Sequence, residues 1–399
     1  MHCETLVKID RTYRESYILL YYKFAFTSDF ITKEINMLDN EVNKNEQVQV
    51  ARRAVLGNVS EGISSLPMES SSTMSAMPNC PKGGVVVKVC YAGICYSEGH
   101  IRKGHFRPAL PGIEIAGVIH DICNTLPNCN IMPGDKVIVY PTEDMVNDGC
   151  QEYIAVDDAD TLVQIPAEVP LEVASMLPGS ALSAHNAVLK AMPHVEKLQK
   201  VKPCVNVLIV GAGSLGLWTL RLANFMIGSQ NSNIRLFVAD NSIDKLITAQ
   251  EHDCHDIIHW CEEDHEQYII ERTLDACRGG VDVVVDFISS PRTMLRSLKV
   301  LNREGLILVG GNAMAEVSIN LNTLAAKQQS IVGIPKGTVE QLHELVQAIA
   351  DKKVEPPLFS VHNFEEAKDV FEELAECRLT GRAILRFNYA NTTSLTDNC

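Results

Sequence analysis

The chain has 399 residues, of which 46% are hydrophobic and 21% charged, and its formal net charge at pH 7 is −15. This composition is typical of a globular protein, and the length is sufficient for two domains of ordinary size. The acidic balance argues against a general nucleic-acid binder, which needs clustered Lys and Arg to hold phosphates. No apolar run reaches the roughly 18 residues of a membrane span, so we expect no membrane partner.

The cysteines and the N-terminal segment bear on localisation. The thirteen cysteines are odd in number and scattered without CxxC pairs, which favours reduced thiols in a cytoplasmic protein over a disulfide framework. The apolar stretch 17–26 is short and interrupted by Lys23, and no small-residue cleavage site follows it clearly. We therefore expect residues 1–50 to form an extension with no assigned chemistry rather than a signal peptide.

The first part of the chain predicts a β-rich domain with few helices. Residues 57–83 are rich in Ser, Met, Pro and Gly, which is typical of a loop. Strands are expected at 54–56, 85–93, 115–119 and 136–139.

After Pro178 the pattern changes to alternating strands and helices, which indicates βαβ units and a parallel sheet. The expected strands are 205–210, 236–239, 256–259, 281–286 and 306–309, and the expected helices are 215–226, 242–251, 267–277 and 293–301. Beyond Gly333 we expect helices at 339–350 and 365–375 and strands at 359–361 and 382–387. These last elements should join the β-rich part in one domain that the βαβ segment interrupts.

A glycine-rich turn follows the first strand of the βαβ segment. It reads Gly211-Ala212-Gly213-Ser214-Leu215-Gly216, with the spacing G-x-G-x-x-G and a helix behind it. Gly211 permits a tight turn, Gly213 lets backbone approach a pyrophosphate, and Gly216 lets the helix pack against the strand. The helix N-terminus offers free N–H groups to phosphates. The turn therefore predicts dinucleotide binding, the alternative being a strand-to-helix turn that holds no ligand.

Asp240 at the end of the next strand refines this prediction. A carboxylate there would accept hydrogen bonds from the adenosine ribose hydroxyls. It lies 24 residues after Gly216, against a usual spacing of about 20, and the polar run 228–233 is interpreted as a loop insertion. Asp240 repels a 2′-phosphate, so NAD is favoured over NADP. Lys245 could reverse that preference, unless it belongs to a solvated helix face.

Seven local sequences, taken together, resemble the medium-chain dehydrogenase/reductase superfamily, the alcohol dehydrogenase-like group. They occur in the family's order: VVVKVCYAGICYS (85–97), LPGIEIAGV (110–118), MPGDKVIV (132–139), ALSAHNA (181–187), 207–216, 281–286 and LTGRAILRF (379–387). The resemblance implies an α/β protein with a Rossmann doubly wound parallel sheet and a GroES-like β-barrel catalytic domain. It divides the chain into an extension (1–50), a GroES-like part (51–180), an NAD-binding Rossmann domain (181–335), a return to the catalytic domain (336–388) and a tail (389–399).

The resemblance also implies where a catalytic zinc would be held, and here the chain departs from the family. Such a zinc needs three protein ligands and an open position. Cys95 matches the first ligand, but Ile113 replaces the histidine that precedes Glu114, and the third ligand falls near Gly179. The four-cysteine lobe of the structural zinc is missing as well. We therefore expect no metal site. Cys95 and Glu114 remain as candidate catalytic residues. The alternative is that Cys95 is a buried apolar side chain and Glu114 an acid in a structural hydrogen-bond or ion-pair network.

Four further positions match functional positions of the family. Ser97 and His100 match the positions of a hydroxyl and an imidazole that relay a proton from substrate to solvent, a role that suits an imidazole. The alternatives are that Ser97 is a helix N-cap and that His100 is a surface residue. Ser183 matches a residue that contacts the nicotinamide ring. Arg382 matches an arginine that contacts the cofactor's phosphates in the family. The alternative is that it is an ordinary arginine at a strand edge, with no role in binding.

The predicted function is hydride transfer between NAD(H) and a small alcohol, aldehyde or ketone without catalytic zinc. Reduction of a quinone or an activated C=C bond is common in zinc-free relatives. The alternatives are a non-catalytic NAD(P)-binding sensor or scaffold, and a zinc enzyme with ligands relocated to His100, His105 or His185. Relatives form homodimers or homotetramers by extending the Rossmann sheet, for which 306–309 followed by 317–319 is the predicted edge.

Overall fold

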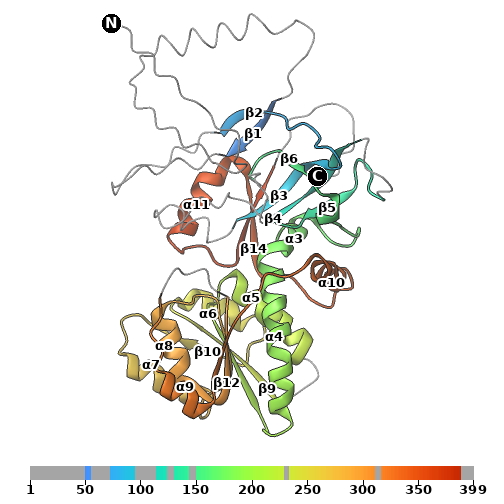
Figure 1. The fold of residues 1–399 in the computed structure, drawn as a ribbon. Helices are drawn as coiled ribbons and strands as arrows, with labels where there is room; N and C mark the ends of the chain where they lie inside the picture. The colour runs from blue at the N-terminus through green and yellow to red at the C-terminus, as the bar shows by residue number, and fades with distance from the viewer. Residues whose placement is uncertain are drawn as a thin grey trace, which may run out of the picture. The chain divides into compact units, whose positions relative to one another are not determined.

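The computed structural model describes residues 50–54, 72–94, 114–123, 130–142, 150–228, 233–310 and 316–387 (Figure 1). Residues 49–399 belong to one unit and residues 1–48 to another, and the fold below is that of the former. The prediction for the N-terminal extension lies, except for Val50, outside the described residues. None of the described helices combines the length and hydropathy of a membrane span.

A six-stranded parallel sheet forms the centre of the second half of the chain. Its strand order is β10-β9-β8-β11-β12-β13, which is the doubly wound Rossmann order when β8 is counted first. Every residue of β8 and of β11 is buried, as expected for parallel strands covered on both faces. The strands are β8 (Val205–Val210), β9 (Ile234–Asp240), β10 (Asp256–His259), β11 (Val281–Asp286), β12 (Leu301–Val309) and β13 (Ser330–Gly333).

Helices and helical turns connect these strands and lead into the sheet. They are α4 (Leu182–Gln199), α5 (Ser214–Ala223), the π-helical turn η3 (Asn224–Gly228), α6 (Ile243–Gln250), α7 (Glu266–Ala276), α8 (Pro291–Val300) and α9 (Leu321–Lys327). The strand order reverses between the neighbours β8 and β11. Ligands of doubly wound sheets bind at such a point, beyond the carboxyl ends of the strands.

A mixed sheet joins the two ends of the unit. It runs β14-β15-β3-β4-β5-β7, with β6 pairing β3, and β15 pairs antiparallel with β3 through Ala383 and Ile94. Its strands are β3 (Val85–Ile94), β4 (Glu114–Ile122), β5 (Lys136–Val139), β6 (Tyr153–Val156), β7 (Leu162–Gln164), β14 (Phe359–Asn363) and β15 (Arg382–Arg386). The C-terminal strands β14 and β15 therefore belong to the same mixed sheet as the strands of the first part of the chain. Together the two sheets form the expected GroES-like and Rossmann architecture.

Shorter elements complete the described chain. A separate two-stranded sheet pairs β1 with β2. The remaining elements are β1 (Val50–Ala54), β2 (Ser72–Ala76), η1 (Ala159–Thr161), α3 (Leu171–Ser175), the π-helical turn η2 (Leu177–Ala181), α10 (Val339–Ala350), η4 (Phe364–Glu366) and α11 (Ala367–Ala375). The predicted loop 57–83 thus contains a strand, and the first predicted strand, 54–56, coincides with β1 at Ala54, its other two residues lying outside the described ranges.

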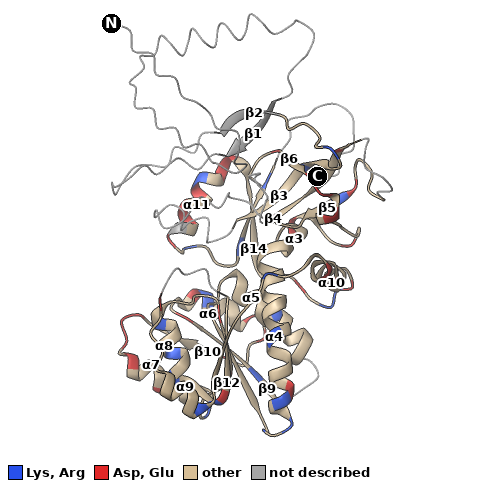
Figure 2. Ribbon diagram, viewed as in Figure 1, with Lys and Arg blue, Asp and Glu red and all other residues tan. Residues whose placement is uncertain are grey.

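Opposite charges are paired across the helices of the Rossmann sheet (Figure 2). Glu266, the first residue of α7, accepts hydrogen bonds from the guanidinium groups of Arg296 and Arg292 on α8. These two groups, Arg296 above all, lower the pKa of the Glu266 carboxyl to about 2. Helices α7 and α8 are thereby tied together over the sheet.

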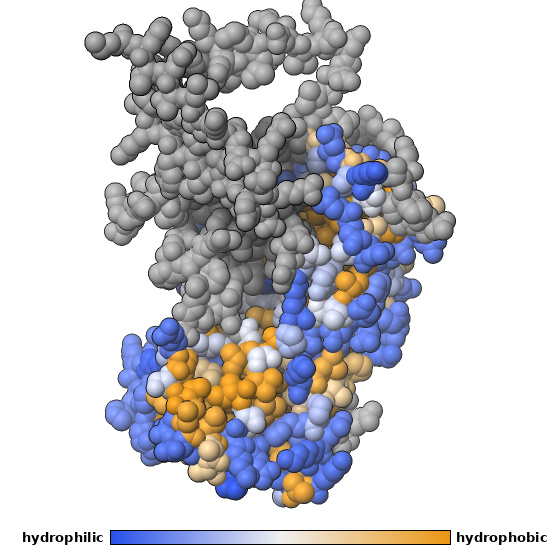
Figure 3. Space-filling view, viewed as in Figure 1, coloured by the Kyte–Doolittle hydropathy of each residue, from blue (hydrophilic) through white to orange (hydrophobic). Residues whose placement is uncertain are grey.

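The predicted edge of the Rossmann sheet is wrong. Strand β12 pairs with β11 on one side and with β13 on the other, and residues 317–319 form no strand. The edge is β13, whose four residues are too short a run to be told from a loop by pattern alone. Figure 3 shows hydrophobic residues gathered on the face where Figure 1 draws α8, α9 and β12. Leu321 of α9 and Val332 of β13 are exposed.

Among the described cysteines, the expectation of reduced thiols fails at Cys90 and holds at the others. Cys90 is disulfide-bonded, whereas Cys204, Cys254 and Cys277 have free thiols.

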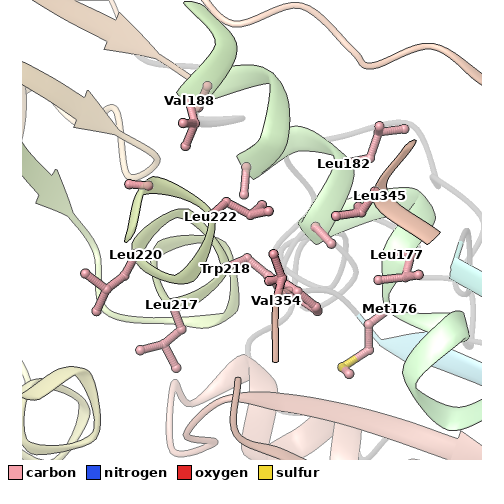
Figure 4. Close-up of a cluster of buried hydrophobic side chains, with 14 of the residues drawn as sticks. Met176, Leu177, Leu182, Val188, Leu217, Trp218, Leu220, Leu222, Leu345 and Val354 are labelled. Atoms are coloured by element: carbon pink, nitrogen blue, oxygen red, sulfur yellow. The ribbon is translucent and has the colours of Figure 1, made fainter. Parts of the chain in front are cut away.

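A hydrophobic cluster holds the segments that cross between the two sheets (Figure 4). Trp218 of α5 is fully buried, and Leu345 of α10, Met176, Leu177 of η2 and Val354 belong to the same cluster. The cluster includes residues of the two segments that connect the sheets: the segment that leads into α4 and the segment that contains α10. The Rossmann helix α5 is therefore packed against both connections to the mixed sheet.

Candidate functional site

The glycine turn begins where β8 ends. Gly211 has a φ of +101°, a conformation that favours glycine, and its N–H donates to the carbonyl oxygen of Ala239 over 2.8 Å. A Cβ at Gly211 would also lie 3.1 Å from the side chain of Ile288, which follows β11. The turn therefore sits at the reversal of the strand order, between β8 and β11.

Gly216 and Gly213 differ in what surrounds them. A Cβ at Gly216 would overlap the carbonyl oxygen of Gly211, whereas a Cβ at Gly213 would meet nothing within 4 Å. Gly216 is thus required for packing the helix on the turn. At Gly213 the backbone faces open space, which is what a close approach by a ligand needs.

The start of α5 leaves polar groups without partners. Gly213 is the N-cap residue and provides no side-chain hydrogen bond, so the first N–H groups of the helix, those of Ser214, Leu215 and Gly216, have no intrahelical acceptor. The hydroxyl oxygen of Ser214 is buried, and among the described residues it has no hydrogen-bond partner. Unpaired donors at a helix N-terminus beside open space fit a phosphate group.

Asp240 is bonded to the turn itself. Its Oδ2 accepts a hydrogen bond from the N–H of Ala212 over 2.7 Å, and its Oδ1 accepts one from the N–H of Ser242 over 2.9 Å. The residue is half-buried, and each carboxylate oxygen can accept a further hydrogen bond. Lys245 lies in the first turn of α6, half-buried. The structure thus brings the glycines, Asp240 and the start of α6 together, as the sequence predicts.

Glu114 forms a second polar centre, in the mixed sheet. It is 1% exposed; its Oε1 accepts from the N–H of Ser180 over 2.6 Å, and its Oε2 accepts from Nε of Arg382 over 2.9 Å. Gly93 and Gly179 flank the carboxylate so closely that a Cβ at either position would overlap it. The absence of side chains at these two glycines is what gives the carboxylate its space.

This arrangement does not fit a catalytic zinc at the position that the resemblance implies. Gly179 has no side chain to ligate a metal, and any side chain there would collide with Glu114. Cys95 and Ile113 lie outside the described residues. Within the described ranges, no group of three His, Cys, Asp or Glu side chains is placed to hold a metal ion.

The remaining predicted site residues are placed as follows. Ser97, His100 and His105 lie outside the described residues. Ser183 is half-buried in the first turn of α4, directly after the turn that bonds to Glu114. Arg382 is 4% exposed and its guanidinium group lies against Glu114, so a role on cofactor phosphates stays a prediction.

The sequence analysis missed Asp286, the last residue of β11. It is fully buried, and its Oδ1 accepts hydrogen bonds from the N–H groups of Ile288 and Ser289. Its Oδ2 has no partner among the described residues, and burial raises the pKa of the carboxyl. Asp286 holds the loop that places Ile288 against Gly211. An acid at the end of a buried strand, as at Asp240, is the signal that could have indicated it.

Known proteins resemble this chain in sequence. Residues 81–167 match the sequence model of the alcohol dehydrogenase GroES-like domain, and residues 215–351 match that of the zinc-binding dehydrogenase family. The NAD-dependent alcohol dehydrogenase of Sulfolobus acidocaldarius is 25% identical over 353 residues, which are 78% of this chain and 94% of that protein. Quinone oxidoreductase-like protein 2 of Bos taurus is 24% identical over 306 residues, 74% of this chain and 81% of that one.

Solved structures agree on the fold. The alcohol dehydrogenase of Aeropyrum pernix superposes with a TM-score of 0.69 at 22% identity, over 84% of this chain and 99% of that chain. Fold, glycine turn and sequence matches define an oxidoreductase of the alcohol dehydrogenase-like class. The chain belongs to the medium-chain dehydrogenase/reductase superfamily.

The Glu114–Arg382 pair generates a test of stability. Substituting Glu114→Gln keeps the side chain's shape but removes the negative charge that lies against the buried Arg382 guanidinium. We expect the free energy of unfolding in urea to fall by about 3–5 kcal/mol. The matched control is Glu304→Gln, which removes an exposed ion pair with Lys197 of 3.3 Å and should cost less than about 1 kcal/mol. Equal losses for the two variants would contradict a structural role of the buried pair.

Proposed function

We propose that this chain is an NAD(H)-dependent oxidoreductase that transfers hydride to or from a small alcohol, aldehyde or ketone without a catalytic zinc. The observation that carries the proposal is the bond between Asp240 and the N–H of Ala212. This bond holds the carboxylate that would bind the ribose against the backbone that would hold the pyrophosphate. The names of the two relatives, an NAD-dependent alcohol dehydrogenase and a quinone oxidoreductase-like protein, support the same class of reaction.

The chain's own residues account for binding and orientation of the dinucleotide. When bound, the nicotinamide supplies the hydride-carrying chemistry. The N–H groups at the start of α5 would hold the pyrophosphate, with Gly213 giving access. Asp240 would accept hydrogen bonds from the ribose hydroxyls and repel a 2′-phosphate, which favours NAD. One relative is named as an NADP⁺-dependent D-arabinose dehydrogenase, so the preference here is argued from Asp240 itself.

The proposal that catalysis is zinc-free is supported by the surroundings of Glu114. The carboxylate occupies the space beside Gly179 and is already committed to Ser180 and Arg382. A substrate oxygen must then gain or lose its proton without metal assistance. By resemblance, Ser97 and His100 carry that proton between substrate and solvent.

Substitutions at Gly213 and Gly216, the last two glycines of the turn, distinguish nucleotide binding from folding. Substituting Gly213→Ala adds a methyl group to open space, so the free energy of unfolding should stay within about 1 kcal/mol of its original value, since φ there is negative. NADH affinity should nevertheless fall at least about tenfold, because the methyl group blocks the close approach. Gly216→Ala should instead destabilise the fold by about 1–3 kcal/mol through overlap with Gly211.

Calorimetric titration of NADH and urea unfolding of both variants measure these effects. Unchanged NADH affinity of Gly213→Ala would show that the nucleotide is not held at this turn.

Turnover tests the reaction class. Oxidation of NADH should be detectable with at least one member of a panel of small aldehydes, ketones, quinones and enones, and it should be faster than oxidation of NADPH. His100→Ala and Ser97→Ala should slow the reaction, because each removes a member of the proton relay. Tight NADH binding with no turnover on any substrate would contradict the proposal and favour a non-catalytic nucleotide sensor or scaffold.

A further inference from the structure

A pocket separate from the glycine turn lies among α4, α5, η3 and α10. It has a volume of about 400 Å³, which is within the range of small-molecule sites. Leu222 lies near the end of α5 that is opposite to the glycine turn. It follows Ser214, the first residue of the helix, by eight positions. At 1.5 Å of rise per residue the two ends are about 12 Å apart. The pocket therefore does not belong to the predicted nucleotide site.

Part of the pocket lining is apolar, and one of its polar residues is buried. The apolar lining includes Leu222, Phe225, Met226 and Ala348, and the buried polar residue is His185 of α4. His185 is 7% exposed, and its Nδ1 has no hydrogen-bond partner among the described residues. Burial lowers the pKa of the imidazole, so the ring is neutral near pH 7 and can accept a hydrogen bond. An unpaired buried imidazole in a pocket wall is suited to a ligand that donates one.

Carboxylates set the sign of the charge at this pocket. Asp351 and Glu344 both line it, together with one cation, Lys353. Lys353 is bonded to Asp351 over 2.8 Å, which leaves the exposed Glu344 carboxylate as the uncompensated charge. Glu344 is close enough to His185 to raise the pKa of that imidazole against the larger effect of burial. A ligand cation would therefore be attracted where a ligand anion would be repelled.

We propose that this pocket is a binding site for a small organic monoamine with an apolar, preferably aromatic, body. The ammonium group donates to His185 and lies near the Glu344 carboxylate. The body of the ligand contacts Leu222, Met226 and the ring of Phe225, and an aromatic residue also attracts a cation. The site is independent of the hydride-transfer chemistry, since none of its lining residues belongs to the glycine turn or to the Glu114 centre.

The test is a calorimetric titration of the full-length protein with 2-phenylethylamine at pH 7, in the presence of saturating NADH. Saturable binding at one site per chain is expected. Phenylacetate, which is similar in size but anionic, and the neutral phenylacetamide should each bind at least about tenfold more weakly, because they lack the charge-assisted hydrogen bonds. Absence of amine binding, or equal affinity for the three compounds, would overturn the proposal.

Variants locate the amine. Glu344→Gln on the exposed face of α10 should weaken amine binding about tenfold or more, whereas Glu196→Gln, an exposed residue of α4 that does not line the pocket, should leave it unchanged. Ala348→Phe should fill the pocket and abolish binding, with NADH affinity retained as the sign of an intact fold. Wild-type affinity in Glu344→Gln and Ala348→Phe, or loss of amine binding when NADH is added, would place the amine elsewhere and refute the assignment.

Discussion

The buried carboxylate of Glu114 joins three parts of the chain that are far apart in sequence. Glu114 begins β4, Ser180 belongs to the turn that leads into α4, and Arg382 begins β15. A carboxylate this deeply buried is stable only when its charge is paired and its oxygens accept hydrogen bonds. The mixed sheet, the crossing into the Rossmann sheet and the C-terminal return must all be in place for that to happen. The contacts of Glu114 can therefore form only when these three parts of the fold are in place.

The same interaction constrains the chemistry. Two glycines make room for the carboxylate, and one of them stands where the resemblance implies a metal ligand. The carboxylate beside that glycine is paired with Arg382 and bonded to the N–H of Ser180. The Rossmann half, in contrast, keeps the features that dinucleotide binding needs: an open Gly213, unpaired donors at α5 and Asp240 bonded to the turn.

Local features of the fold could be predicted from sequence, and features that depend on distant contacts could not. The glycine turn, Asp240 and most strands of the Rossmann sheet follow from contiguous patterns of apolar residues and glycines. Strand β13 has only four residues, and its role as the sheet edge depends on pairing with β12 rather than on its own pattern. The contacts of Glu114 with Ser180 and Arg382 span 66 and 268 positions, so a single sequence contains no signal for them. Asp286 was missed because its effect on Gly211 passes through the loop that contains Ile288.

We propose that hydride transfer in this protein proceeds without a metal at the Glu114 centre. Elemental analysis of purified, catalytically active protein, before and after treatment with a chelator, tests it most directly. The account predicts a zinc content far below one ion per chain and turnover that the chelator leaves unchanged. A content of one zinc per chain, with activity lost on chelation and restored by added zinc, would contradict it.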